Sequence, residues 1–345
     1  MKKILFSLVA LVAATNVFGQ EPEPTKLRDA NLKGNVLAVQ YGKFEYKENF
    51  GEPTAGDVRE LNSTFYDEKG RSILYRTLSY GYDRTYAHSY LFEYADEGNN
   101  VKVSRPSLQT VNTRDVYTAY EQALLAANGA FEELMRTTPN KDNHNNTCFP
   151  YLLSEYTYDN AQVQILYDLK YSRDNKLKAK VVAKPIGGGM YEFTIYKENG
   201  EVGEKSKRTF KNGMLVKMEK ERMGLIHYRG DIPSPEAGTY TYDTKGNLTH
   251  ILLANNEERK YDFNEKGDII KESKKVYKTW SNTFFYENYK YDEQGNWISR
   301  TVGSDAGKPQ FIEKRVITYC SGADELKEKA AQVQATAGQA IKVEQ

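Results

Sequence analysis

The chain has 345 residues, and 48 Lys plus Arg against 47 Asp plus Glu give it a formal net charge of +1. A balance this close to neutral gives no reason to expect nucleic acid or an anionic membrane as a partner. After the first twenty residues no segment approaches eighteen consecutive apolar residues, so we expect no transmembrane segment.

Residues 1–19 have the pattern of a secretory signal peptide. Lys2 and Lys3 precede an apolar run, and Val17 and Gly19 are small enough for a cleavage site after Gly19. The apolar run is too short to span a membrane, and the absence of a nearby cysteine argues against a lipid anchor. We therefore expect an exported protein, periplasmic or extracellular, whose remaining residues carry a formal charge near −1.

One short phrase recurs through the rest of the chain, as in "YDTKGNL" at Tyr242–Leu248 and "YDEQGNW" at Tyr291–Trp297. Aligned on its turn residue, the phrase occurs at Gly70, Gly98, Asn175, Gly200, Gly213, Gly246, Gly267 and Gly295. All but the Gly213 copy have an aromatic residue four positions earlier, and an apolar residue often stands two positions after the turn. Aromatic residues at a period of two favour a β-strand, and glycine or asparagine permits a positive φ in a short loop. Each copy therefore predicts a β-hairpin.

The aspartate three residues before the turn glycine, present as Asp67, Asp243 and Asp292, predicts carboxylate acceptors for backbone N–H groups within the turn. Aromatic residues repeated at one position of successive hairpins are typical of a core. Trp297 is expected to pack near Tyr291.

The long interval between Gly98 and Asn175 contains a different pattern. Its apolar residues follow the stride of one helix face: Tyr117, Tyr120, Leu124, Ala127, Phe131 and Leu134. Together with Pro139 beyond its end, this pattern predicts an inserted helix at about 113–137. The segment 156–168 resembles a further hairpin of weaker pattern.

No motif in the chain indicates catalysis, a metal or a cofactor. Asp142, His144 and Cys148 have the spacing of three metal ligands, but the surrounding loop offers no second ligand pair. The triple glycine at 187–189 lacks the histidine and the nucleophile elbow that accompany an oxyanion loop in hydrolases. We predict no catalytic residues, no metal and no cofactor.

Trp280 and Tyr277, in "KKVYKTWSNTFF", are aromatic residues outside the repeat register. Aromatic side chains stack on sugars and peptides, so these two are the candidate binding residues.

The C-terminal residues 321–345 differ again. Ser321 stands three residues before Asp324, which is similar to a capping box, and a thin apolar stripe follows at Leu326, Ala330 and Val333. This pattern predicts a short helix that frays into a disordered tail.

The two cysteines, Cys148 and Cys320, are an even number in a chain predicted to be exported. They are candidates for a disulfide, and two buried thiols are the alternative.

The phrase YDxxGNL resembles the YD repeats of the Rhs proteins and teneurins, best at Tyr242–Leu248 and Tyr291–Trp297. The resemblance implies tandem hairpins that form a long β-sheet strip, which in that family coils into a shell. Family shells use dozens of repeats and enclose a toxin-like domain, whereas this chain has eight or nine copies and no such domain. The leader and the tyrosine-rich strands also resemble exported proteins of Bacteroidetes-type bacteria.

These observations predict a mainly β fold: an antiparallel meander of hairpins at residues 20–320 that forms a curved sheet, with one inserted helix and a short C-terminal helix. The predicted function is a non-catalytic binding or structural module of the cell envelope, with a glycan, peptide or protein partner. Two alternatives stay open, a carbohydrate hydrolase whose carboxylates meet only in the fold, and a shell or scaffold fragment that acts with a partner protein.

Overall fold

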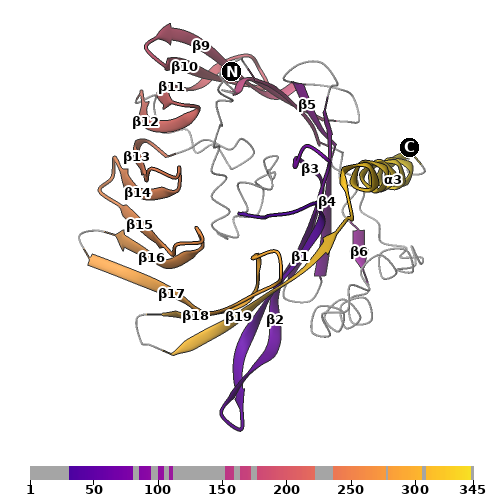
Figure 1. The fold of residues 1–345 in the computed structure, drawn as a ribbon. Coiled ribbons are helices and arrows are strands. Elements are labelled where there is room, and N and C mark those ends of the chain that lie inside the picture. The colour runs from indigo at the N-terminus through magenta and orange to yellow at the C-terminus, as the bar shows by residue number, and fades with distance from the viewer. Residues whose placement is uncertain are drawn as a thin grey trace. The chain divides into compact units, whose positions relative to one another are not determined.

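The computed structural model describes residues 31–80, 85–94, 100–104, 109–111, 152–158, 164–171, 177–221, 236–276, 279–304 and 308–342. In this part the chain is mainly antiparallel β-sheet with one C-terminal helix, as the repeat predicted (Figure 1). The predicted signal peptide at 1–19 and the predicted helix at 113–137 lie outside the described residues. The chain divides into two compact units. Of the described residues, unit 1 comprises those within 92–104 and 150–283, and unit 2 comprises those within 31–91, 105–111 and 284–342.

Unit 1 is an antiparallel meander in which each strand pairs with the one that follows it in the sequence. The described strands are β5 (Asn100–Ser104), β7 (Leu152–Tyr158), β8 (Gln164–Tyr171), β9 (Leu177–Gly187), β10 (Met190–Lys197), β11 (Val202–Lys211), β12 (Met214–Lys220), β13 (Gly238–Tyr242), β14 (Leu248–Leu253), β15 (Glu258–Phe263) and β16 (Ile269–Val276). Strand β5 pairs with β7.

Unit 2 contains the first and the last strands of the described chain. Its elements are β1 (Val36–Asn49), β2 (Glu52–Tyr66), β3 (Ser72–Tyr80), most of β4 (Thr85–Tyr94), β6 (Gln109–Val111), most of β17 (Thr279–Tyr291), β18 (Trp297–Ser304), β19 (Pro309–Tyr319) and α3 (Ala323–Lys342). Strand β1 pairs on one side with β2 and on the other with β19, which joins the N-terminal strand to the C-terminal one.

The turn prediction is confirmed at every copy of the phrase that the structure describes. The turn glycines have φ between 71° and 89° at Gly70, Gly200, Gly213, Gly246, Gly267 and Gly295. An added Cβ is disfavoured at such φ, so glycine suits these positions. Gly98 and Asn175 lie outside the described residues.

In the three described phrases that contain it, the aspartate organises the turn as predicted. Asp243 Oδ1 accepts the backbone N–H of Lys245 at 2.8 Å and that of Asn247 at 2.8 Å, while Oδ2 accepts the Asn247 side-chain amide at 2.8 Å. Asp67 and Asp292 accept the equivalent backbone N–H groups. One carboxylate thus accepts hydrogen bonds from N–H groups that have no backbone acceptor within the tight turn.

The aromatic repeat positions form core, as expected. In unit 1, Leu248, Ile251, Leu253 and Tyr261 form a buried cluster against partly buried neighbours that include Tyr240, Tyr242 and Phe263. In unit 2, Trp297 is 4% exposed and is the cross-strand partner of Tyr291. Trp297 is therefore a core residue.

The C-terminal helix α3 has 20 residues, longer than the short helix that the sequence predicted. Leu326 and Ala330 are buried, and α3 lies against β1, β2 and β3. The first turn is capped by Glu325, whose carboxylate accepts both the backbone N–H and the hydroxyl of Ser321 at 2.6 Å. The capping residue is thus Glu325, one position after the predicted Asp324.

Candidate functional site

A row of alternating charges crosses four neighbouring strands of unit 2. Lys43 on β1 is the register partner of both Glu60 on β2 and Glu313 on β19, and Glu313 is the partner of Arg300 on β18. Side chains two residues apart on a strand share a face. We call this group the Arg300 cluster; it comprises Tyr41, Lys43, Glu60, Trp297, Arg300, Glu313 and Arg315.

Arg300 and Glu313 form the most buried ion pair of the cluster. Glu313 Oε2 accepts Arg300 Nε at 2.6 Å and lies 2.5 Å from Nη2, and the Glu313 side chain is 5% exposed. Burial raises the pKa of Glu313, but Arg300 and Lys43 lower it by more, so the net pKa lies below the ordinary value. Burial lowers the pKa of Arg300, but Glu313 together with neighbouring tyrosine hydroxyls raises it by more, so the net pKa lies above the ordinary value. Both groups are therefore charged at neutral pH.

Aromatic rings hold the Arg300 guanidinium in place. Its Cζ lies 4.3 Å from the Trp297 ring centroid and 4.4 Å from that of Tyr286. Arg300 Nη1 also donates to the Tyr289 hydroxyl at 3.0 Å. A guanidinium stacked on aromatic faces and paired to a carboxylate has little freedom to move.

The pKa of Glu60 is shifted in the opposite direction to that of Glu313. Burial raises its pKa, Lys43 lowers it and Glu313 raises it, and the net pKa lies above the ordinary value. The Asn62 amide donates to Glu60 Oε1 at 3.1 Å. Burial, followed by Glu313 and Glu60, raises the pKa of Tyr41 well above its usual value. One face of the sheet thus carries two carboxyl groups that lose their protons at different pH.

Arg315 differs from Arg300 because no carboxylate pairs with it among the described residues. Its Cζ lies 3.6 Å from the Trp297 ring centroid. Its Nε and Nη1 atoms are buried without a hydrogen-bond partner. Burial, together with repulsion from Arg300, lowers the pKa of Arg315 to about 10. The guanidinium is held by a ring and still lacks an acceptor.

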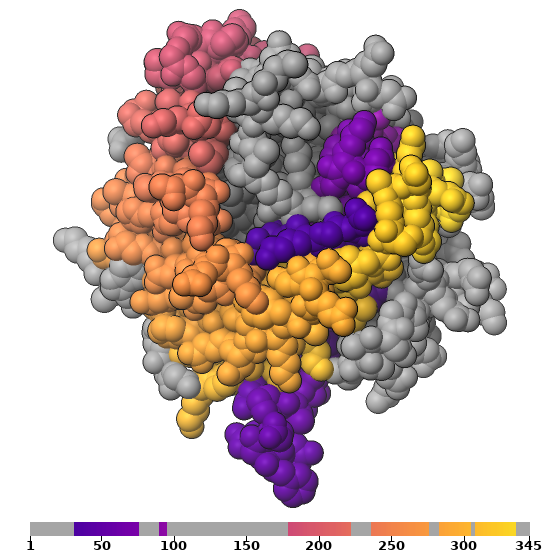
Figure 2. Space-filling view, viewed as in Figure 1, coloured from indigo at the N-terminus to yellow at the C-terminus, as the bar shows by residue number. Residues whose placement is uncertain are grey.

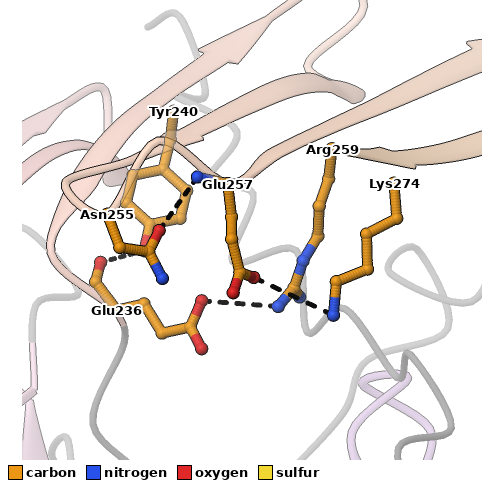
Figure 3. A network of polar contacts seen from close by, with 6 residues as sticks. All are labelled: Glu236, Tyr240, Asn255, Glu257, Arg259 and Lys274. Carbon is orange, nitrogen blue, oxygen red and sulfur yellow. Dashed lines mark hydrogen bonds and ion pairs between the residues drawn. The ribbon is translucent and has the colours of Figure 1, made fainter. Parts of the chain in front are cut away.

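A second polar network lies in unit 1, where its ionic groups are paired (Figure 3). Arg259 Nη2 lies 3.3 Å from Glu236 Oε2, and Lys274 Nζ lies 3.9 Å from Glu257 Oε2. The Tyr240 hydroxyl donates to the backbone carbonyl of Glu236 at 2.5 Å, and burial followed by Glu236 raises the pKa of Tyr240 to about 12. This network links β13, β15 and β16 and has the character of a structural contact.

The sequence-predicted site residues are not tested by the described part of the chain. Tyr277 lies outside it, and Trp280 lies in β17 with its side chain undescribed. Cys320 is buried, while Cys148 and its neighbours Asp142 and His144 lie outside. The described residues contain no group of three metal-ligating side chains. They also contain no helix both long and apolar enough to cross a membrane.

The Arg300 cluster was not predicted from the sequence. The alternations Tyr41-x-Lys43 and Glu313-x-Arg315 are visible in the sequence, and each indicates a strand with a polar face. Nothing local indicates that these two strands are neighbours, because β1 does not belong to the repeated phrase.

No protein-family model and no curated protein sequence matches the chain. Among solved structures, it aligns with a porin-like protein from Bacteroides uniformis with a TM-score of 0.30 and 9% identity, covering 83% of this chain and 99% of that one. It also aligns with the complex TcdB2-TccC3-Cdc42 with a TM-score of 0.22 and 12% identity. That alignment covers 76% of this chain but 15% of the other. At these scores we draw no argument from the similarity.

Proposed function

We propose that this chain is a non-catalytic binding or structural module exported to the cell envelope. The observation that carries the proposal is how the described hairpins use the residues of the repeated phrase. The glycine forms the turn in all six described copies, an aspartate organises it in the copies at Gly70, Gly246 and Gly295, and aromatic residues of the phrase pack in the core. What remains for a partner is the polar side chains on the strand faces, and the Arg300 cluster is one such group.

Those side chains suit recognition of a polar ligand. The Arg300 cluster holds hydrogen-bond donors and acceptors on paired strands, and strands position side chains more rigidly than loops do. The signal-peptide pattern at residues 1–19 supports export, and a ligand of the envelope follows from that location.

The regular turn geometry supports the relationship to YD repeats. The described turns at Gly70, Gly246 and Gly295 share the same aspartate contacts, although more than two hundred residues separate the first from the last. Tandem hairpins of one geometry make an extended sheet, which is also the architecture expected of a scaffold that acts with a partner protein.

A paired screen tests the proposal. The mature protein is assayed on a panel of chromogenic glycosides, esters and peptides, and in parallel on an array of glycans and cell-wall fragments. We expect binding without turnover. Hydrolysis that a single Asp or Glu substitution abolishes would overturn the non-catalytic assignment. If the protein neither hydrolyses nor binds anything in the two assays, the scaffold alternative is favoured. Reproducible capture of one protein from envelope extract would then identify its partner.

A carbohydrate hydrolase is the second candidate, and one observation favours it. Glu60 and Glu313 share a face two strands apart, with a raised and a lowered pKa respectively. Glycosidases use such a pair, one protonated carboxyl and one carboxylate. Glu60→Gln would abolish turnover in an enzyme of this kind, and the panel above contains the substrates that reveal it.

A further inference from the structure

We propose that this chain binds a second copy of itself, with the tip of hairpin β1–β2 in one copy docked on the end of hairpin β9–β10 in the other. The first surface, the Phe50 tip, comprises Glu48, Phe50 and Glu52. The second, the Ile186 patch, comprises Lys184, Ile186, Met190 and Lys211. The inference goes beyond the proposed function, because binding of an envelope ligand does not require self-association.

Phe50 occupies a backbone position that suits other residue types. Phe50 and Gly51 form the loop between β1 and β2, with φ of 52° and 83°. Every other described residue with a positive φ is a glycine or an asparagine, which tolerate this conformation better than a bulky residue does. The Phe50 side chain is fully exposed, so it stabilises no core. Neither the turn nor the packing explains a phenylalanine here, and this indicates a contact outside the chain.

The Phe50 tip carries an excess of negative charge. The two basic side chains of the ribbon at 45–59 are each in an ion pair, Lys47 with Asp57 and Arg59 with Glu45. Glu48 and Glu52 are exposed on either side of the loop, and neither forms an ion pair with a described residue. Because like charges repel, two such tips do not suit each other. The charge and the exposed ring instead favour an apolar surface with a positive rim.

The Ile186 patch has these properties. Ile186 and Met190 flank the turn of hairpin β9–β10, and both side chains are exposed. Lys184 lies two residues before Ile186, and β11, which pairs with β10, ends beside the turn at Lys211. Both lysines are exposed, and neither is in an ion pair with a described residue. The turn thus combines two apolar side chains with two cations that lack a partner.

The nearby carboxylate does not cancel this positive charge. Glu192 lies opposite both Lys184 and Lys207 in the strand register. Together with Lys211 at the end of β11, three lysines stand against one glutamate. The end of this hairpin therefore stays positive, and it complements the two carboxylates of the Phe50 tip.

The other large apolar side chains that are exposed in the described chain suit the tip less well. Leu252 and Ile270 lie on β14 and β16, which both pair with β15 and not with each other. Each presents one apolar side chain, whereas the Ile186 patch presents two within five residues. The tip and the patch are both exposed in the single chain, so we assign the contact to two copies. A contact this small is expected to be weak.

Two variants disable one surface each and leave the fold intact. Phe50→Asn places a residue that tolerates positive φ in the loop, so its melting temperature should equal or exceed that of the wild type. The double variant Lys184→Glu, Lys211→Glu reverses two exposed charges outside the core. Leu252→Asn is the matched control, because it removes an exposed apolar side chain outside both surfaces.

Sedimentation velocity of the full mature protein over a concentration series tests the inference. We expect the sedimentation coefficient of the wild type and of Leu252→Asn to rise with concentration, and the rise to weaken at high salt, which screens exposed charges. Phe50→Asn and the double lysine variant should each need at least a tenfold higher concentration for the same rise. An equal mixture of these two variants contains one intact tip and one intact patch, so it should form a dimer and nothing larger.

Four results would overturn the inference. The wild type stays monomeric at about 1 mM; Phe50→Asn or the double lysine variant associates as the wild type does; the mixture of the two variants stays monomeric; or Phe50→Asn melts at a lower temperature, which would show that the phenylalanine serves the fold. Association that the double lysine variant leaves unchanged while Phe50→Asn removes it would assign the tip to a different surface. None of these results changes the outcome of the ligand and substrate screens.

Discussion

The turn residues show at the scale of single side chains how the repeat specifies its hairpins. Each described turn glycine has a positive φ, and where an aspartate stands three positions earlier, as at Asp67, Asp243 and Asp292, it accepts hydrogen bonds from backbone N–H groups of the turn. Neither residue depends on a distant part of the chain. The phrase therefore encodes a complete turn within a few residues.

The first prediction tests the turn backbone. Gly200 has a φ of 80° with no atom within 4 Å of an added Cβ, and Gly295 has a φ of 78°. Valine at either position should destabilise the protein by about 1–2 kcal/mol or more, because the left-handed conformation is strained for any residue with a Cβ. Denaturant unfolding measures the loss. Gly322→Ala is the control, since Gly322 has space for a Cβ and no positive φ. Equal stability of all three variants would contradict the turn assignment.

The second prediction concerns the charge of the turn aspartate. Burial raises the pKa of Asp243, but hydrogen bonds from Asn247, Lys245 and Gly246 lower it by more, so its net pKa in the folded state is depressed. A depressed pKa adds stability above the unfolded pKa, and this stability is lost as the pH falls through the folded pKa. Asp243→Asn should therefore be less stable than the wild type at pH 6, and the gap should narrow below about pH 4. A gap that stays constant from pH 6 to pH 2 would exclude a role for the charge.

At the scale of elements, hairpin β1–β2 extends beyond the sheet that supports it. The pairing of β1 with β19 ends at Glu45, whereas β1 and β2 stay paired to Asn49 and Glu52. Figure 2 shows this ribbon projecting beyond β18 and β19 of the same unit. Phe50 at its tip is fully exposed. A two-stranded ribbon is marginally stable by itself, so its order depends on the paired base.

The third prediction concerns the ion pair that links β18 to β19. Arg300→Met should destabilise the protein by about 3–5 kcal/mol, because it leaves the Glu313 carboxylate buried without its partner. Adding Glu313→Leu should recover much of this loss, because the double variant has no unpaired charge. A double-mutant cycle measured by denaturant unfolding gives the coupling. Additive losses from the two substitutions would show that the pair contributes no coupling energy.

At the scale of the whole molecule, residues near the N-terminus bind the last hairpin. The Asn296 side-chain amide donates to the backbone carbonyl of Lys33 at 2.9 Å, and its oxygen accepts the Lys33 N–H at 2.8 Å. The same amide lies 2.6 Å from the Tyr319 hydroxyl, which donates to Asp292. The Cys320 N–H donates to the carbonyl of Asn35 at 2.8 Å. A repeat residue thus connects the two ends of the described chain within unit 2.

The fourth prediction follows from that contact. Asn296 is 2% exposed, so Asn296→Ala should leave the backbone groups of Lys33 without partners and cost about 1–3 kcal/mol. Asn247→Ala is the control, because Asn247 occupies the same place in its own turn and bonds to Asp243 alone. Hydrogen exchange should show faster exchange at Lys33 in the Asn296 variant. Unchanged exchange there would contradict the role of Asn296 in holding this segment.

The fifth prediction concerns the two cysteines. If Cys148 and Cys320 are joined, mass spectrometry of unreduced peptides from the exported protein will find them linked, and a reducing agent will lower the melting temperature. Native labelling of both thiols would exclude the bridge. Cys320 is buried, so labelling is to be repeated after unfolding without reductant.

The hairpins, their turns and the packing role of the aromatic residues follow from local patterns in the sequence. Glycine, aspartate and the strand period act over at most six residues, and backbone geometry over that distance is set by local sterics and hydrogen bonds. Trp297 could be assigned to the core next to Tyr291 for the same reason. Helix α3 was predicted to be shorter because its stripe is thin, and its length was decided by packing against β1, β2 and β3.

The pairing of strands that lie far apart in the sequence could be read from the folded structure alone. Strand β1 lies between β2 and β19, and this pairing places Lys43 between Glu60 and Glu313 and brings Arg315 next to Tyr41. No local pattern encodes such a contact. The pairing of distant strands depends on the summed free energy of burial and hydrogen bonding along whole strands. The Arg300 cluster forms because this pairing places β2, β1, β19 and β18 side by side.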